Sequence, residues 1–121
     1  MNDEKKQFVE NLKQRFKNYV VRSTKLYQSL PKSGEAKIFG NQFLRSASSA
    51  AANHRAACRT RSAKEFFAKM SIVVEEIDES CFWIEILIET NIVNESMVAD
   101  LLKEGNELLA ISSKARKNTN L

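Results

Sequence analysis

The sequence predicts an all-α fold, an up-down-up-down antiparallel four-helix bundle, formed by a single domain over residues 1–121. The chain contains only three Gly and one Pro, too little turn-forming material for a β-sandwich or barrel. Apolar residues recur at helical spacing along four segments. Short connections between these segments require consecutive helices to run antiparallel. A chain of this length buries roughly two-thirds of its unfolded surface, so we expect it to fold without a disulfide, metal or cofactor.

The first two helices are expected over residues 4–29 and about 34–59. Pro31 ends the first helix, and Ser33 followed by Glu35 supplies an N-cap and a first-turn acid for the second. The first helix carries an apolar face opposite several lysines, which makes it amphipathic with a basic outer surface. The residues of that face are Val9, Leu12, Phe16, Tyr19, Val20, Ser23, Leu26 and Leu30.

The third and fourth helices are expected over residues 63–90 and 94–116. Ser62 and Glu65 have the spacing of a capping box, in which each side chain satisfies a backbone N–H at the other residue. Asn94 is the expected N-cap of the fourth helix. The core stripe of the third helix is Phe66, Met70, Val73, Ile77, Cys81, Ile84 and Ile88, and that of the fourth is Val98, Leu101, Leu102, Leu108 and Leu109.

The second helix contains a run of small residues from Ser46 to Ala52 that allows another helix to approach closely. A polar seam follows one side of it at intervals of four, three and four residues. We interpret the seam as a packing and specificity device, with Arg45 beside it and the acids of the third helix as acceptors for that arginine. The seam consists of Gln42, Ser46, Ser49 and Asn53, and the acids are Glu75, Glu76 and Glu79.

His54 and Cys58 lie one helical turn apart, a spacing at which two side chains can reach one metal ion. Zinc requires three or four protein ligands, and Cys81 is the only further soft donor in a chain with one His. We therefore expect His54 to be a hydrogen-bonded histidine of the core or of an interface. No phosphate-binding loop, metalloprotease motif or nucleophile motif occurs, and the sequence predicts a protein that is not an enzyme.

A second apolar face on the third helix lies opposite its core stripe. It consists of Ile72, Phe82, Trp83 and Ile86. A bundle helix of a monomer needs only one apolar face, so this patch predicts an oligomer interface, most simply with another copy of the chain. The alternative is that a neighbouring loop or the fourth helix covers Trp83.

The charge is divided unevenly along the chain. Residues 1–70 hold 15 Lys or Arg and 5 Asp or Glu, a balance of +10, whereas residues 71–121 hold 4 and 10, a balance of −6, which together give the net +4. This division is compatible with basic helices packing on acidic ones, with subunits pairing head to tail, or with a basic face that binds a polyanion.

The location expected from the sequence is the cytoplasm. The N-terminal residues lack the apolar segment of a signal peptide, and no stretch approaches the roughly 20 apolar residues of a membrane span. Cys58 and Cys81 are then reduced thiols.

The chain resembles a known bacterial family in a specific set of motifs. Residues 42–53 read Gln-Phe-Leu-Arg-Ser followed by small residues and Asn, and residues 55–62 continue with an arginine-rich segment. Further matches are Glu65-Phe66, Ala68-Lys69, Glu75-Glu76, Asp78-Glu79-Ser80 and Phe82-Trp83. The family is called the four helix bundle proteins, or the ribosomal RNA intervening-sequence or S23 family, because some members are encoded within insertions in large-subunit ribosomal RNA genes.

This resemblance implies a cytosolic bundle that assembles as a ring-like homopentamer with a central channel. A related protein, the accessory factor of diversity-generating retroelements, is a basic pentamer that binds nucleic acid. Many relatives carry Asn-Ile-Ala-Glu where this chain has Asn53-His54-Arg55-Ala56. The chain therefore lacks that acid and has a more basic second helix.

Two hypotheses for function follow. In the first, an oligomer binds RNA or DNA non-specifically through phosphate contacts, multiplied around the assembly. In the second, the same cations pair with acidic helices across subunits, and the protein is an assembly or adaptor module for a protein partner. The residues predicted to contact nucleic acid are Lys13, Lys17, Arg45, Arg55, Arg59, Arg61 and Lys64.

Overall fold

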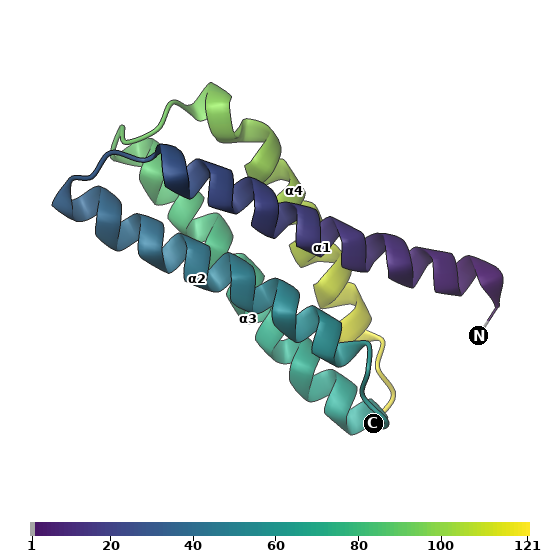
Figure 1. Cartoon of the computed structure of the whole chain (residues 1–121). Helices are drawn as coiled ribbons and strands as arrows, with labels where there is room; N and C mark the ends of the chain where they lie inside the picture. Colours follow the sequence, from purple (N-terminus) through teal and green to yellow (C-terminus); the bar gives the residue numbers. More distant parts are fainter. Residues whose placement is uncertain (1) are drawn as a thin grey trace.

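The computed structural model describes residues 2–121 and contains four helices that confirm the predicted bundle (Figure 1). The helices are α1 (Asp3–Ser29), α2 (Gly34–Ala57), α3 (Ala63–Glu89) and α4 (Glu95–Lys117). Their bounds differ from the predicted ones by at most two residues. The largest difference is at the end of α2, where Cys58 remains in a helical conformation as the C-cap and Thr60 is outside the helix.

The predicted caps are only partly as expected. The side chains of Ser62 and Asn94 accept backbone N–H groups at the starts of α3 and α4, as predicted. Ser33 has the extended backbone of an N-cap, but its side chain makes no capping hydrogen bond. The capping box is also incomplete, because Glu65 Oε2 accepts the backbone N–H of Arg61 at 3.0 Å instead of that of Ser62.

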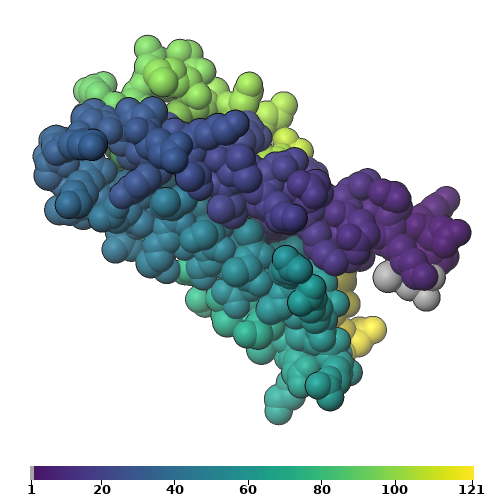
Figure 2. All heavy atoms as spheres, viewed as in Figure 1, coloured from purple at the N-terminus to yellow at the C-terminus, as the bar shows by residue number. Residues whose placement is uncertain are grey.

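Each helix packs against its neighbours in sequence, and the bundle closes where α1 meets α4. The α2–α3 pair has the most extensive contact, and the α1–α4 pair has the least. The first turns of α1 stand clear of the other three helices (Figures 1 and 2). Consistent with this, residues 2–8 are all exposed to solvent. The bundle is therefore tight along α2 and α3 and open only along the first turns of α1.

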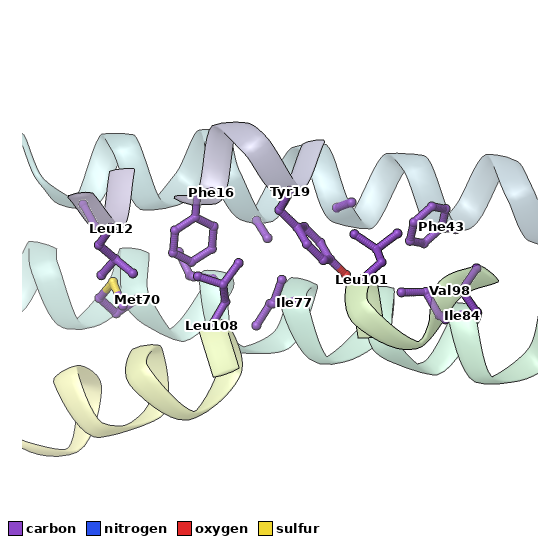
Figure 3. Close-up of a cluster of buried hydrophobic side chains, with 14 residues drawn as sticks. Leu12, Phe16, Tyr19, Phe43, Met70, Ile77, Ile84, Val98, Leu101 and Leu108 are labelled. Carbon is purple, nitrogen blue, oxygen red and sulfur yellow. The ribbon is translucent and has the colours of Figure 1, made fainter. Parts of the chain in front are cut away.

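The core forms where the predicted apolar stripes of α1, α3 and α4 converge on α2, which contributes Phe43 and small residues (Figure 3). Phe16 and Tyr19 of α1 point between α2, α3 and α4, and each is at most 1% exposed. The predicted stripe of α3 is buried from Met70 to Ile84, while its ends, Phe66 and Ile88, are half-buried. Leu87 is buried although the prediction omitted it.

Small residues set the closest helix contacts. Ala47 and Ala50 of the small-residue run are fully buried, which is consistent with the extensive α2–α3 contact. On α4, Gly105 lies against Tyr19 and Cys81: a Cβ atom there would come within 2.8 Å of the Cys81 Sγ and 2.9 Å of the Tyr19 Oη. The Tyr19 hydroxyl crosses the core and shares a 2.8 Å hydrogen bond with the Ser80 hydroxyl.

Candidate nucleic-acid interface

A groove between α1 and α2 brings together three of the seven predicted phosphate-contacting residues. It has a volume of about 590 Å³ and is open on one side. Lys13 and Lys17 line it from α1, and Arg55 lines it from α2. The small side chains of Ala51 and Ala52 also line it, so the α2 side of the groove is low and accessible. Two consecutive helices thus contribute cations to one concave surface, although Lys13 and Lys17 are far from Arg55 along the chain.

The groove is positive, although one acid belongs to it. Glu10 lines the groove, and its Oε1 forms an ion pair with Lys13 Nζ at 3.0 Å. Because the Glu10 side chain is 66% exposed, this pair is a weak surface interaction that a phosphate can replace. Lys17 and Arg55 make no ion pair within residues 2–121.

His54 also lines this groove, and its ring packs against the core residue Phe16. It is 4% exposed, and its ring stacks on Phe16 with a centroid distance of 4.2 Å. The prediction of a core histidine is correct, but the predicted hydrogen bonding is largely wrong. Nδ1 has no partner within the described residues, and Nε2 has only the Cys58 Sγ at 3.9 Å. Burial, reinforced by the charge of Lys13, lowers the pKa of His54 to about 4.

Arg61 lies in the turn that joins α2 to α3, with Arg59 just before it and Lys64 just after it. All three are exposed, and Arg61 lines a shallow depression with Cys58 and Thr119. None of the three forms an ion pair within residues 2–121. The turn lies at the end of the bundle where α2 ends and α3 begins (Figure 1). The groove cation Arg55 lies one helical turn before Arg59, so the two groups of cations are continuous along α2.

Arg45 is separate from the other predicted cations. Its guanidinium pairs with Glu76 at 2.9 Å and with Glu79 at 2.5 Å, both on α3. The predicted pairing with the acids of α3 is therefore confirmed for two of the three. Burial raises the pKa of Glu79, but hydrogen bonds from Trp83 and Arg45 outweigh it and the net pKa is lowered. The charge of Arg45 is thus already compensated, unlike that of Arg55.

The polar seam of α2 satisfies itself within its own helix. The Ser46 hydroxyl donates to the backbone carbonyls of Gln42 and Phe43, and the Asn53 amide donates to the carbonyl and hydroxyl of Ser49. Within residues 2–121, the seam residues make no side-chain hydrogen bond to α3, whereas the neighbouring Arg45 donates to Glu76 and Glu79. The seam therefore runs from exposed Gln42 past fully buried Ser46 to half-buried Asn53, and the hydroxyl of Ser46 and the amide of Asn53 are satisfied without a partner helix.

The second apolar face of α3 is partly covered by α2. Trp83 is half-buried and stacks on Phe39 at 5.8 Å, with its indole N–H donating to Glu79 at 3.0 Å. The covering residue comes from α2, and not from a loop or α4 as the alternative supposed. Phe82 and Ile72 remain 50% and 39% exposed, and Ile86 is half-buried.

Sequence reasoning omitted the cations in the last turn of α4. Lys114, Arg116 and Lys117 lie there, and Arg116 is oriented by α3: its Nε donates to the Ser71 hydroxyl at 2.7 Å, and its guanidinium lies 4.4 Å from the centre of the Phe67 ring. The missed signal is the absence of acids after Glu107 in a segment with three cations.

Cys81 is buried and Cys58 is half-buried, and both are free cysteines. Burial raises the pKa of Cys81 to about 11 and also raises that of Cys58, which keeps both thiols protonated. Within residues 2–121 no three His, Cys, Asp or Glu side chains are placed to share a metal ion. The same part of the chain contains no helix with the length and apolarity to cross a membrane.

Comparison with known proteins places the fold and the motifs in one family. The family model described as "23S rRNA-intervening sequence protein" matches residues 10–114. A solved structure of a protein with unknown function from the S23 ribosomal protein family of Bacteroides thetaiotaomicron VPI-5482 superposes with a TM-score of 0.82 at 26% identity. The match covers 88% of this chain and 99% of that one. No curated protein matches the sequence. The chain belongs to the 23S rRNA-intervening sequence protein family.

Proposed function

We propose that this protein is a non-enzymatic, oligomeric four-helix bundle that binds RNA or DNA through phosphate contacts, without reading base sequence. The observation that carries the proposal is the α1–α2 groove, in which Lys13, Lys17 and Arg55 meet. Arg59, Arg61 and Lys64 extend this surface around the end of α2. We call these six residues the basic surface.

The contents of the basic surface favour a phosphate backbone over bases. Its members are flexible, charged side chains on helices, which follow a line of phosphates without a fixed hydrogen-bonding frame. The groove lining contains no exposed aromatic side chain on which a base could stack. A further support is the contrast with Arg45, whose charge is taken up by two glutamates, whereas Arg55, Arg59 and Arg61 have no carboxylate partner within residues 2–121.

Assembly multiplies such contacts. A single basic surface offers only a few phosphate contacts, and each weakens as salt rises. Copies arranged around a homo-oligomer act on one strand at high effective concentration, so modest contacts combine into useful affinity. The partly exposed α3 residues Ile72 and Phe82, beside Trp83 and Ile86, are the proposed subunit contact. The expected oligomer is a pentamer, as the family resemblance implies.

The test is nucleic-acid binding measured across a salt series. Wild-type protein is titrated into a labelled single strand and a labelled duplex between about 50 and 200 mM salt, where phosphate-based affinity falls by orders of magnitude. The variant that carries Arg55→Ala, Arg59→Ala and Arg61→Ala is expected to bind at least tenfold more weakly at low salt. The slope of log affinity against log salt concentration should be shallower by about one for each phosphate contact that the variant has lost.

The control removes three cations at the other end of the bundle. Lys25, Lys32 and Lys37 are exposed, and the variant with all three changed to Ala has the same net charge as the arginine variant. It is expected to bind within about twofold of wild type if the basic surface, and not net charge, determines affinity. An oligomer that binds no nucleic acid at low salt would contradict the proposed function.

A second candidate is a protein-binding adaptor without nucleic-acid binding. The exposed Phe82 beside Trp83 supports it, because an aromatic pair of this kind is typical of the centre of a protein interface. The two candidates separate in the same experiment. An adaptor keeps its assembly state and gives no salt-dependent binding of either nucleic acid.

A further inference from the structure

Tertiary structure adds cations from the end of the chain to the basic surface. Lys114, Arg116 and Lys117 come from the last turn of α4, and residues 108–121 contain no Asp or Glu. Thr119, two residues beyond this turn, lines the same depression as Arg61 and Ser62 of the α2–α3 turn. The N-terminal and C-terminal halves, which differ in overall charge, therefore contribute the same charge at this end of the molecule (Figure 1).

Arg116 is the one cation of this turn whose position the fold controls. Its Nε donates to the Ser71 hydroxyl at 2.7 Å, and its Cζ lies 4.4 Å from the centre of the Phe67 ring. The side chain is half-buried, so much of the entropy cost of ordering it is already met in the folded protein. No group in residues 2–121 accepts a hydrogen bond from its two Nη nitrogens, and no carboxylate there lies within ion-pairing distance.

This arrangement differs from that of the other two oriented arginines. Arg15 donates two hydrogen bonds to Glu104, and Arg45 reaches Glu76 and Glu79. In both cases the fold supplies carboxylates for the guanidinium. Cations at a helix C-terminus are favoured by the helix dipole alone, but the dipole does not require a guanidinium fixed on an aromatic ring of another helix. An oriented guanidinium with open Nη groups matches the geometry of a phosphate oxygen pair.

We propose that the last turn of α4 is a phosphate-binding element, with Arg116 as its anchor and Lys114 and Lys117 as flanking contacts. This inference rests on the proposed function and deepens it: the bound strand continues from the basic surface across the α2–α3 turn onto α4. The ligand class is a nucleic-acid phosphodiester. Arg116 contributes directed hydrogen bonds, and the two lysines contribute charge.

The test compares two substitutions of Arg116 in the full-length protein. Arg116→Gln removes the charge, and we expect five- to tenfold weaker binding of an oligouridine strand at low salt and a salt dependence shallower by about one phosphate contact. Arg116→Lys keeps the charge, so it should preserve the salt dependence but still weaken binding, because an ammonium lacks the planar fork. A merely structural role for Arg116 would not produce this difference between the two variants.

The matched control is Lys103→Gln, which removes one charge from an exposed position on the same helix away from its last turn. It should bind within twofold of wild type. The double variant Lys114→Gln with Lys117→Gln leaves Arg116 and its contacts with α3 in place, so it tests the element even if Arg116→Gln alters the fold. Helical circular dichroism and thermal unfolding identify that case.

The outcomes separate this inference from the proposed function. Wild-type binding that is weakened by the Arg55, Arg59 and Arg61 variant but unchanged by both Arg116→Gln and the double lysine variant overturns the inference alone. Absence of any nucleic-acid binding by the wild type overturns both. Competition by polyglutamate as effective as that by the strand at equal charge would show an acidic peptide surface and would overturn the phosphate assignment.

Discussion

His54 is a buried histidine that the fold keeps neutral. It lies between the ring of Phe16 and the α1–α2 groove, and burial lowers its pKa to about 4 with a further contribution from the charge of Lys13. The unfolded chain binds a proton at His54 near pH 6.5, whereas the folded protein does so only near 4. Folding therefore excludes a proton from this residue over that range.

The first prediction concerns the pH dependence of stability. Because the unfolded state binds more protons at His54 between pH 6.5 and 4, the free energy of unfolding should decrease as pH falls through this range, and the contribution of His54 itself should level off below it. The total change from His54 is on the order of 3 kcal/mol. Urea unfolding at several pH values measures it. The variant His54→Leu should lose most of this slope, and an unchanged slope would contradict the assignment.

Carboxylates set the lowest pH at which the effect of His54 on stability can be measured. The pKa of Glu104 is lowered, chiefly by its hydrogen bond from Arg15, and that of Glu79 is lowered on balance by Trp83 and Arg45. Their stabilising contributions are present above pH 4.5 and are lost as pH falls through their lower native pKa values. The His54 effect is therefore measured above that pH.

The second prediction concerns Gly105. Replacement by Ala would bring its Cβ to 2.8 Å from the Cys81 Sγ and 2.9 Å from the Tyr19 Oη, so buried side chains must move. This overpacking outweighs the better helix propensity of Ala, and Gly105→Ala should lower the free energy of unfolding by about 1 to 2 kcal/mol.

Gly34→Ala is the control for this prediction. No atom lies within 4 Å of the Cβ that it adds at the first residue of α2. Its stability should stay within about 0.5 kcal/mol of wild type or rise slightly. Equal effects of the two substitutions in urea unfolding would refute the close contact of α4 with Tyr19 and Cys81.

Among the helices, α1 is the least firmly packed. Its contact with α4 is the least extensive of any neighbouring pair, and its first turns project beyond the bundle (Figure 2). Arg15 supplies the polar link between them, with Nε and Nη2 each donating to Glu104, at 2.9 and 2.6 Å, and a weaker contact to Glu107. This clamp raises the pKa of Arg15 and fixes where α1 leaves the bundle.

The third prediction tests this clamp. Arg15→Lys keeps the charge but cannot make the two-point contact with Glu104, so the free energy of unfolding should fall by no more than about 1 kcal/mol. Hydrogen exchange should accelerate mainly in residues 3–15, because the projecting half of α1 has few other contacts. Arg22→Lys is the control, since Arg22 is exposed on the same helix and forms no ion pair in residues 2–121. Equal exchange in both variants would contradict the clamp.

For the whole molecule, the second apolar face of α3 is an apolar surface that the bundle leaves partly uncovered. Its residues lie on the outside of the α2–α3 pair, where Trp83 rests on Phe39 and Phe82 packs edge-on against Trp83 at 4.9 Å. Phe82 is half exposed. An aromatic side chain supported in this way is pre-ordered for the subunit contact that we propose.

The fourth prediction is that Phe82→Asp reduces the proposed oligomer to smaller species. A carboxylate at the centre of an apolar subunit contact costs several kcal/mol of association free energy if left unpaired, whereas the exposed position tolerates it within the monomer. Sedimentation of wild type and variant gives the mass directly, and Trp83→Asp should act in the same direction. Phe8→Asp, at a position that is 58% exposed on the projecting part of α1, is the control. An unchanged assembly in both α3 variants would reject this interface.

The fold was predictable from the sequence because its signals are local. Helical spacing of apolar residues, the caps Ser62 and Asn94, and Pro31 after the first helix each act over a few neighbouring residues. The candidate site was less predictable. The sequence placed Arg45 and Arg55 in one set of predicted phosphate contacts, but in the structure α3 supplies two carboxylates to Arg45 and none to Arg55.

By itself the sequence determined four helices, their order, their core faces and the membership of its family. The run from Ser46 to Ala52 was sufficient to predict close packing of α2. Only the tertiary structure decided which charges remain available, because ion pairing depends on side chains brought together from different helices. It paired Arg15 with Glu104 and selected Glu76 and Glu79 from the three acids predicted for Arg45. It also brought Lys13 and Lys17 to the groove beside Arg55, and it placed the guanidinium of Arg116 over the Phe67 ring.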